Sequence, residues 1–244
     1  MGDRRRLRQA GIAPDVARLS DEAETRMSFA MGGPGGVAAR AGRLALRARG
    51  YASGCLLICG WEGEPDAIAR RRAPAARALR RARAMPVGGG TGRAWLASRY
   101  AAPHLRDDLL DRGVLAETLE TATSWSNLEP LRAAVRRALE AALAAPLVVC
   151  HVSHLYATGA SLYFTILAAQ DRSDPAGQWR GAKRAATDAI VAAGGTITHH
   201  HAVGADHAPW LPAEVGPLGH DLLRLLRERC DPAGVMNPGK LLAT

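Results

Sequence analysis

Two apolar runs joined by a short connection carry the strongest structural signal in this chain: Leu147-Val-Val-Cys-His-Val-Ser-His-Leu-Tyr156 and Ser161-Leu-Tyr-Phe-Thr-Ile-Leu167. Both runs are rich in β-branched and aromatic residues, which are typical of strands. The connection, Ala157-Thr158-Gly159, is short and contains the glycine that tight turns favour. The pattern therefore predicts a β-hairpin over residues 147–167.

The segments on either side of this hairpin predict further strands and helices. Strands are expected at residues 56–58 and 114–122, with a short extended piece at 196–201. Helices are expected at about 65–83, 93–100, 127–144, 176–193 and 218–230. Pro74 strains the first of these helices, and Gly194-Gly195 provides a C-terminal stop for the fourth. This order predicts an α+β fold in which helices cover one side of an antiparallel sheet.

The first fifty residues show the weakest pattern. The run Gly32-Gly33-Pro34-Gly35-Gly36 interrupts any regular element, and residues 38–49 are rich in alanine and arginine without clear periodicity. We therefore expect residues 1–50 to be a poorly ordered lead-in or loop. Residues 51–244 are expected to form one domain.

Composition narrows the class of protein. The chain has 244 residues and a net charge of +9, and all its basic residues are arginines except Lys183 and Lys240. With 48% hydrophobic and 23% charged residues, it is unlike a disordered, collagen-like or disulfide-stapled chain. The four cysteines are scattered, and neither a secretory signal nor a transmembrane segment is visible. We expect a cytoplasmic protein.

The basic excess raises the alternative of a nucleic-acid-binding module. Its arginines form two clusters, at residues 4–8 and 70–83. The second cluster lies on an expected helix and contains no aromatic residue that could stack on a base. A solvated helix face is the favoured explanation, and salt-sensitive binding to DNA or RNA would mark the alternative. No nucleic-acid partner is expected.

A histidine run is the most distinctive chemical feature of the chain: Gly194-Gly-Thr-Ile-Thr-His-His-His-Ala-Val-Gly204. Consecutive side chains on an extended segment point alternately to opposite faces, so at most two of the three imidazoles could reach one ion. The neighbouring sequence offers no cysteine or spaced carboxylate to complete a metal site. Proton transfer or anion binding suits the run better, because imidazole titrates near neutral pH.

Two further residues have both an ordinary and a functional interpretation. Tyr163 lies inside an apolar strand, where a tyrosine is usually buried with a satisfied hydroxyl group. Arg106 is followed by Asp107, Asp108 and Asp111, so a surface ion pair is its simplest role. From the residues alone, the ordinary interpretation is favoured for both.

Four stretches together resemble one family. They are the histidine run, Tyr156-Ala-Thr-Gly-Ala-Ser-Leu-Tyr-Phe164, Asp231-Pro-Ala-Gly-Val-Met-Asn-Pro-Gly-Lys-Leu-Leu242, and Arg106-Asp107 ahead of Glu117-Thr-Leu-Glu-Thr-Ala-Thr-Ser-Trp125. From about Arg18 to its C-terminus the chain is similar to the C-terminal domain of FAD-linked oxidases, above all to the alkyldihydroxyacetonephosphate synthase group. The resemblance implies a ferredoxin-like cap domain, of the kind found in vanillyl-alcohol oxidase type flavoenzymes.

The resemblance also implies roles for individual residues. Tyr163 matches the catalytic tyrosine of the family, which gives or takes a proton at the substrate. His199, His200 and His201 match the histidine cluster that is needed for activity beside the flavin. Arg106 matches the arginine that contacts the anionic group of the substrate. Asn237 and Lys240 lie in a C-terminal segment that returns toward the flavin, and we expect them to bind the cofactor.

One branch of the superfamily binds a divalent metal through a His-x-Gly-Asp-Gly-Asn-x-His strand. At the corresponding place this chain reads His151-Val-Ser-His-Leu-Tyr-Ala-Thr-Gly, which has neither that spacing nor the acidic residue. We therefore expect no metal.

Family members carry an N-terminal FAD-binding domain ahead of this region, with a glycine-rich segment that holds phosphate. Nothing before Arg18 matches that domain, and we assign Gly88-Gly-Gly-Thr-Gly92 to a turn rather than to a phosphate loop. The expectation is an enzyme half whose FAD is held mainly by a missing or separate domain, in cis or in trans.

The reaction of such an enzyme stays open between two classes. Ordinary family members oxidise a small hydroxy acid or alcohol, whereas the synthase group exchanges an acyl group for a fatty alcohol without net oxidation. The expected substrate is an anionic small molecule or a lipid-like one, and a homodimer is compatible with the sequence. The alternative to an enzyme is a truncated cap domain that has lost catalysis.

Overall fold

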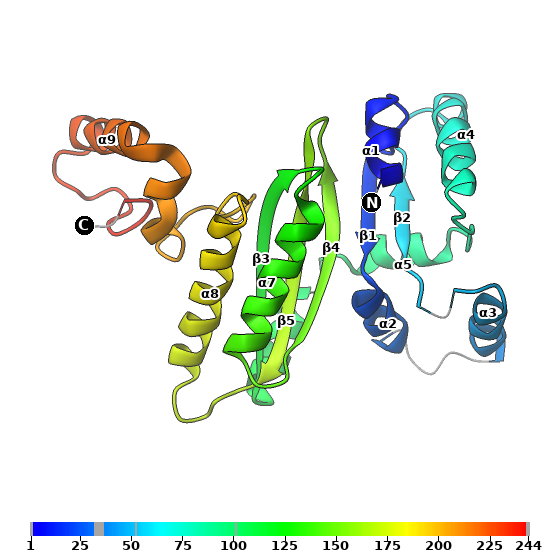
Figure 1. The fold of residues 1–244 in the computed structure, drawn as a ribbon, viewed down its shortest axis with the longest axis horizontal. Coiled ribbons are helices and arrows are strands. Elements are labelled where there is room, and N and C mark those ends of the chain that lie inside the picture. Colours follow the sequence, from blue (N-terminus) through cyan, green and yellow to red (C-terminus); the bar gives the residue numbers. More distant parts are fainter. Residues whose placement is uncertain (1, 32–36, 52, 101, 243–244) are drawn as a thin grey trace.

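The computed structural model describes residues 2–31, 37–51, 53–100 and 102–242, which contain a five-stranded antiparallel sheet (Figure 1). Its strands lie in the order β2-β1-β4-β5-β3. Their bounds are Val16–Ser20 for β1, Leu57–Gly60 for β2, Val114–Ser124 for β3, Leu147–Leu155 for β4 and Gly159–Ala169 for β5. The predicted α+β class, with an antiparallel sheet, is confirmed.

The predicted hairpin forms the centre of the sheet. Strand β5 pairs with β4 on one side and along its whole length with β3 on the other, from Val114 opposite Ala169 to Ser124 opposite Gly159. At Gly159 the two backbones approach closely, because a Cβ atom there would lie 2.0 Å from the carbonyl oxygen of Thr123. Only glycine fits this position, so it fixes how β5 begins against β3.

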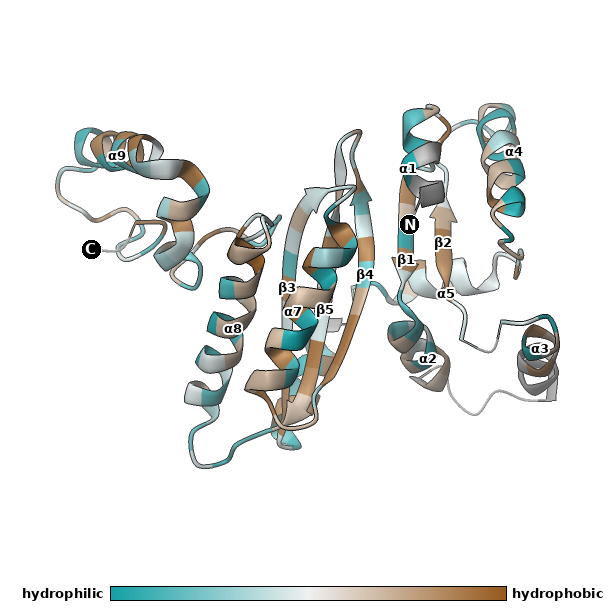
Figure 2. Cartoon of the chain, in the orientation of Figure 1, coloured by the Kyte–Doolittle hydropathy of each residue, from teal (hydrophilic) through white to brown (hydrophobic). Residues whose placement is uncertain are grey.

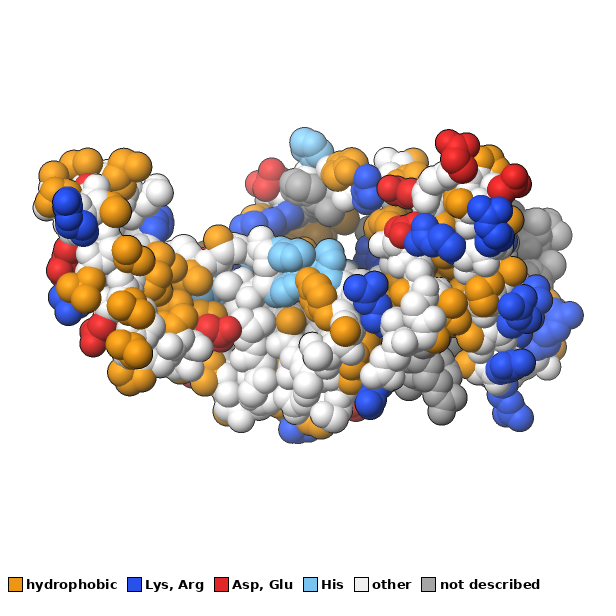
Figure 3. All heavy atoms as spheres, turned by 90° about the horizontal axis from the view of Figure 1, so that it is seen from above, with side chains coloured by type: hydrophobic (Ala, Val, Ile, Leu, Met, Phe, Trp, Pro, Cys, Tyr) orange, Lys and Arg blue, Asp and Glu red, His pale blue; other side chains and the backbone are white. Residues whose placement is uncertain are grey.

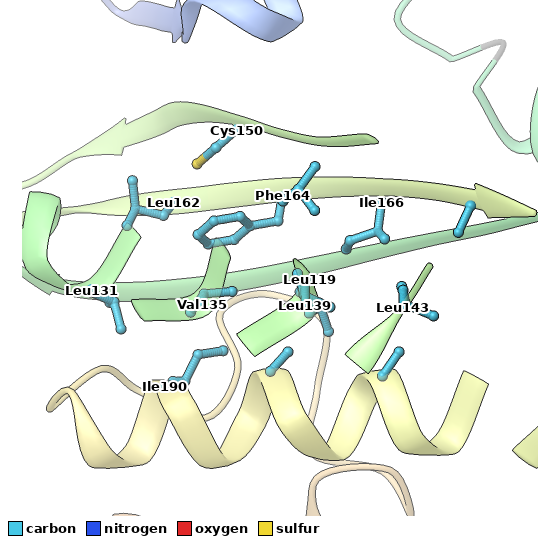
Figure 4. Close-up of a cluster of buried hydrophobic side chains, with 14 of the residues drawn as sticks. Leu119, Leu131, Val135, Leu139, Leu143, Cys150, Leu162, Phe164, Ile166 and Ile190 are labelled. Carbon is cyan, nitrogen blue, oxygen red and sulfur yellow. The ribbon is translucent and has the colours of Figure 1, made fainter. Parts of the chain in front are cut away.

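Two helices cover one face of the sheet, as expected. They are α7 (Leu128–Ala142) and α8 (Pro175–Ala192), and α8 begins at Asp174, whose carboxylate accepts a hydrogen bond from the backbone N–H of Gly177. Every second residue of β5, including Phe164, points to these helices because side chains alternate along a strand. Figure 4 shows how Leu162, Phe164 and Ile166 face side chains of α7 and α8 in this core.

The opposite face of the same strands is polar. Glu120 of β3 pairs with Tyr163 of β5, and Tyr163 pairs in turn with His151 of β4, so the three residues form one row across the sheet. Their register places them on the side away from α7 and α8, since their neighbours Leu119, Leu162 and Val152 belong to the core. This row is the starting point of the candidate site.

The first fifty residues are not an irregular lead-in, and that prediction is wrong for the described part of them. They contain α1 (Gly2–Gln9), strand β1, α2 (Glu22–Met31) and α3 (Val37–Ala48), and β1 pairs with both β2 and β4. The Asp21 carboxylate ties this region to β4, because it accepts hydrogen bonds from the backbone N–H groups of Glu24 and Cys150. A local sequence pattern cannot show such a long-range contact. The run at residues 32–36 lies outside the described residues.

The connection from β2 to β3 is helical: it holds α4 (Pro65–Arg81, with Pro74 inside), α5 (Gly90–Ser98) and α6 (Ala102–Asp111). The glycine-rich segment at residues 88–92 follows helix α4 and a loop rather than a strand, so it lacks the strand–loop–helix context of a phosphate-binding unit. Its assignment to a turn holds only for Gly88 and Gly89, because residues 90–92 form the first turn of α5.

The C-terminal part differs from the prediction in two places. Residues 196–201 form an irregular loop instead of an extended strand, with positive φ at His200 and Ala202. After the short 3-10 helix η1 (Ala208–Trp210), helix α9 begins at Leu211 rather than near residue 218, and runs to Cys230 with a kink at Gly216. Figure 2 shows hydrophobic and hydrophilic residues alternating along α9.

Among the described helices, none has the length and apolarity to cross a membrane.

The core predicts how the fold responds to truncation. Phe164 is fully buried, so Phe164→Ala leaves a large cavity under α7 and should lower the free energy of unfolding by about 3–5 kcal/mol. Leu147 lies on the neighbouring strand but is 42% exposed, and Leu147→Ala should cost about 1 kcal/mol at most. Urea unfolding followed by circular dichroism measures both. Equal losses for the two variants would contradict this location of the core.

Candidate active site on the open face of the sheet

The histidine run lies over the polar row because its loop is anchored to the end of β3. The hydroxyl of Thr121 donates to the carbonyl of Thr196 at 2.6 Å, and the backbone N–H of Thr196 donates to the carbonyl of Ala122 at 3.0 Å. Gly195 permits this approach, since a Cβ atom there would meet Leu131 and Thr121 at 2.8 Å. The loop that follows therefore places its imidazoles beside Glu120. Figure 3 shows the histidine side chains gathered on this surface beside a hollow.

A buried carboxylate lies at the centre of these imidazoles. The Glu120 side chain is 4% exposed, and its Oε1 lies 3.1 Å from Nδ1 of His199. Nε2 of His201 lies 3.7 Å from the other carboxylate oxygen, and Nε2 of His154 lies 3.9 Å from Oε1. The hydroxyl of Ser153 donates a hydrogen bond to Oε1 at 3.2 Å. We call Glu120, His154, His199, His200 and His201 the histidine cluster.

Tyr163 stands between two imidazoles. Its ring stacks on His151, with centroids 4.9 Å apart, and meets the ring of His201 edge-on at 5.5 Å. Its side chain is partly exposed on the open face, so the interpretation of Tyr163 as an ordinary buried tyrosine does not hold. The structure thus brings together the tyrosine and the histidines that the sequence singled out.

A second buried carboxylate holds His151 from the other side. Oε1 of Glu24, on α2, is 2.9 Å from Nδ1 of His151 and accepts a hydrogen bond from Arg18 at 2.6 Å. Burial alone would raise the pKa of the Glu24 carboxyl, but the hydrogen bond with His151 and the charges of His151 and Arg18 outweigh it and lower the pKa to about 2. Glu24 is therefore ionised throughout the neutral and mildly acidic range.

The surroundings of His154 favour its neutral form, whereas those of Glu24 favour the charged form. Partial burial lowers the pKa of its imidazole, and although the Glu120 carboxylate raises it, the neighbouring rings of His200, His199 and His151 lower it further. His154 is therefore biased toward the neutral form, in which one ring nitrogen carries a lone pair.

Three predicted site residues lie elsewhere. Arg106 is exposed on α6, and within the described part of the chain no hydrogen bond or ion pair joins it to the histidine cluster. Asn237 and Lys240 are exposed in the turn that follows α9. The backbone of this C-terminal segment does return to the loop after the histidines, because the N–H of Leu241 donates to the carbonyl of Gly204 at 2.9 Å.

The comparison with known families agrees with this arrangement of fold and site. The family model described as FAD linked oxidases, C-terminal domain, matches residues 3–241. The chain belongs to this family.

Relatives of this FAD linked oxidase domain include two alkyldihydroxyacetonephosphate synthases. The one from Dictyostelium discoideum is 30% identical over 98% of this chain, and the one from Trypanosoma brucei brucei is 27% identical over 95% of it. A solved alkyldihydroxyacetonephosphate synthase structure superposes with a TM-score of 0.74 and 26% identity, covering 97% of this chain and 42% of that one. The chain spans about two fifths of the length of these relatives.

The open face can accept the reactive ring of the flavin that the family name implies. It presents a phenol and several imidazoles, and the Nδ1 atom of His199 is buried without a hydrogen-bond partner among the described residues. Such groups suit the polar edge of a bound ring. In the described ranges, no strand–glycine loop–helix unit lies on this face to hold the diphosphate of FAD.

A large cavity lies in the N-terminal part of this domain, apart from the histidine cluster. It has a volume of about 1060 Å³ and is lined mainly by apolar side chains of α2, α3, β2, α4 and the loop before α5. Four arginines also line it: Arg26, Arg47, Arg72 and Arg80. Thr25, which lines this cavity, follows Glu24 in sequence, and Glu24 contacts His151 of the polar row. The same turn of α2 therefore contributes residues to the cavity wall and to the support of the row.

Sequence reasoning missed Glu120, Glu24 and His151. The signal for Glu120 was strand alternation: in the expected strand at 114–122, Glu120 stands on the face opposite Leu119. The alternation alone does not show what Glu120 is close to. To place it near the histidines, one would also need to know that its strand pairs with the strand that contains Tyr163. Glu24 carried no comparable signal, because its partner His151 comes from a strand far along the chain.

The depressed pKa of Glu24 predicts an acid-dependent loss of stability. An ionised Glu24 contributes stability above its ordinary pKa of 4.5, and this contribution is lost as the pH falls toward about 2. The shift corresponds to about 3 kcal/mol. Glu24→Gln should therefore be destabilised by roughly this amount at pH 6, and the difference from the parent chain should shrink by pH 2.5.

Urea unfolding at several pH values measures this difference. The control is Glu22→Gln, which changes an exposed carboxylate in the same helical turn and should follow the parent chain at every pH. A difference between Glu24→Gln and the parent that stays constant from pH 6 to pH 2.5 would contradict the ion pair.

Proposed function

We propose that this chain is the substrate-binding and catalytic half of a flavin-dependent enzyme resembling the alkyldihydroxyacetonephosphate synthases. The observation that carries the proposal is the position of Tyr163, with its ring against His151 and His201 on the open face of the sheet. A phenol ionises near pH 10, so it needs neighbouring bases to exchange protons near pH 7. Flanking imidazoles supply such bases.

In this proposal, the residues on the open face have different roles. Tyr163 gives or takes the proton at the substrate, and His201 relays it, because its ring meets the tyrosine edge-on while one nitrogen approaches the Glu120 carboxylate. Flavin, when bound, supplies the electron-accepting or electrophilic centre. The side chains of this face bind and orient the substrate against that centre and limit the access of water.

The proposed partner is a FAD-binding domain, in cis or in trans. The chain spans two fifths of its relatives, and large apolar residues on α9 and the segment after it lack cover: Leu218 is 74% exposed, Val235 is 72% and Met236 is 68%. Contiguous exposed apolar surface is typical of a binding interface. This surface therefore supports a packing partner beside the C-terminal segment.

The proposed substrate is anionic, either a small molecule or a lipid. The cavity supports a lipid-like substrate, since its apolar walls suit a hydrocarbon chain and its arginines suit phosphate or carboxylate. Arg106 is proposed to bind the anionic group from α6, where its guanidinium is exposed. Net oxidation and group exchange are both compatible with this arrangement.

Replacing the tyrosine tests the proposed catalysis. The chain is fused to the part of the Dictyostelium discoideum synthase that lies outside the matched region, and two reactions are followed: transfer of a labelled fatty alcohol and anaerobic reduction of the flavin by hydroxy acids. Tyr163→Phe should lower the turnover of the active reaction by about 10²–10⁴-fold, as expected for the loss of a proton-transfer group. Tyr100→Phe is the control, because Tyr100 is 76% exposed and belongs neither to the polar row nor to the histidine cluster. Full activity of Tyr163→Phe would exclude the proposed role.

Cofactor binding provides a separate test. The isolated chain should be colourless after purification, because the described residues lack a diphosphate-holding unit. Association with the FAD-binding part should restore flavin absorbance. Stoichiometric FAD on this chain alone, measured by visible absorption of the released cofactor, would contradict the proposal that a separate domain holds the flavin.

A further inference from the structure

Three side chains of the histidine cluster, those of Glu120, His199 and His200, converge closely enough to hold one ion. One ligand atom each from Glu120, His199 and His200 lies within 4.8 Å of the other two. The sequence argument against a metal site rested on the lack of a nearby carboxylate. The fold supplies that carboxylate from β3, a strand far from the histidines in sequence.

One tautomer of His199 leaves a lone pair on its inner nitrogen. Its Nε2 atom forms a hydrogen bond of 2.9 Å with the hydroxyl of Tyr156, while its buried Nδ1 has no hydrogen-bond partner among the described residues. When Nε2–H donates to the tyrosine oxygen, Nδ1 presents a lone pair to the Glu120 carboxylate only 3.1 Å away. Two electron-rich atoms at this distance repel each other unless a proton or a metal cation lies between them.

We propose that Glu120, His199 and His200 bind one divalent transition-metal ion of the Zn²⁺ class, with His154 able to complete the coordination. Bonds of about 2.0–2.2 Å to nitrogen and oxygen place tetrahedral donors about 3.3 Å apart. The pair formed by Glu120 and His199 is already at that separation, and the exposed His200 can close the rest by rotating its side chain. Mixed imidazole and carboxylate ligands suit this class of ion.

The imidazoles around Glu120 are packed closely against one another. The rings of His199 and His200 stack with centroids 3.9 Å apart, and His154 meets His200 at 4.6 Å. A cation bound between the carboxylate and these rings would compensate the buried negative charge of Glu120.

Two neighbours hold the ligands in position. Tyr156 orients the His199 ring through Nε2, and Ser153 donates to the Glu120 carboxylate at 3.2 Å. Hydrogen bonds of this kind fix ring orientation and ligand basicity in metal sites. The ligand set leaves His201 beside Tyr163, so the metal site goes beyond the proposed proton transfer without replacing it.

Zinc binding by the isolated chain tests the proposal. Tag-free protein is dialysed against a chelator, returned to chelator-free buffer and titrated with ZnCl₂ in a calorimeter. The expected result is one ion per chain with a dissociation constant in the micromolar range or below. Glu120→Gln, His199→Asn and His200→Asn should each weaken binding at least tenfold. His104→Asn and Glu140→Gln, which change an exposed histidine and an exposed glutamate outside the cluster, should bind like the parent.

Tyr156→Phe separates orientation from ligation. It keeps every proposed ligand but removes the partner of Nε2, so it should weaken zinc binding by about 10–100-fold at unchanged stoichiometry. Thermal unfolding without zinc shows which variants are folded, and if Glu120→Gln is not, the two histidine variants carry the test. No saturable binding by the parent, or equal binding by all folded variants, would overturn the proposal. The assay contains no flavin or substrate, so its outcome is independent of the test on Tyr163.

Discussion

The register of β5 between β3 and β4 is the constraint on which both the core and the candidate site depend. Side chains alternate along a strand, so a slip of one residue would turn Phe164 toward the open face and Tyr163 into the core. The close approach at Gly159 opposes such a slip, because a different residue would bring a Cβ atom against the backbone of β3. The same register sets Glu120, Tyr163 and His151 in one row. Core packing and site geometry are therefore two consequences of one pairing.

Elements whose stabilising contacts lie close in sequence were predictable, whereas elements held by contacts between distant parts of the chain were not. The hairpin and helices α7 and α8 were predictable, since their apolar periodicity and end signals are local. Strand β1 was missed because its pairing is not local: Ser20 lies opposite His151. For the same reason, the sequence singled out the histidines and Tyr163 but not Glu120, which lies beside them only in the folded chain. The irregular loop at residues 196–201 was mistaken for a strand because its shape follows from hydrogen bonds to β3.

The positive charge of the chain is concentrated in one part of the fold. Nineteen of the 32 basic residues, but only eight of the 23 acidic ones, lie within residues 1–100. The positive excess therefore belongs to the part of the chain that contains α1 to α5, β1 and β2, where four arginines line the cavity. The rest of the chain, including the histidine cluster, carries slightly more acidic than basic residues. A net charge of +9 describes one region rather than the whole surface.

The two buried carboxylates explain why Tyr163 is held so firmly on an otherwise open face. Glu24 fixes His151 on one side of the tyrosine ring, and Glu120 faces His201 on the other. A buried carboxylate that loses its partner is left uncompensated, which costs far more than an exposed pair would. The contacts with these carboxylates restrain the two imidazoles, and the tyrosine ring between them is restrained in turn. In the proposed function, a tyrosine restrained in this way would lose little further freedom on binding a substrate, which favours proton transfer.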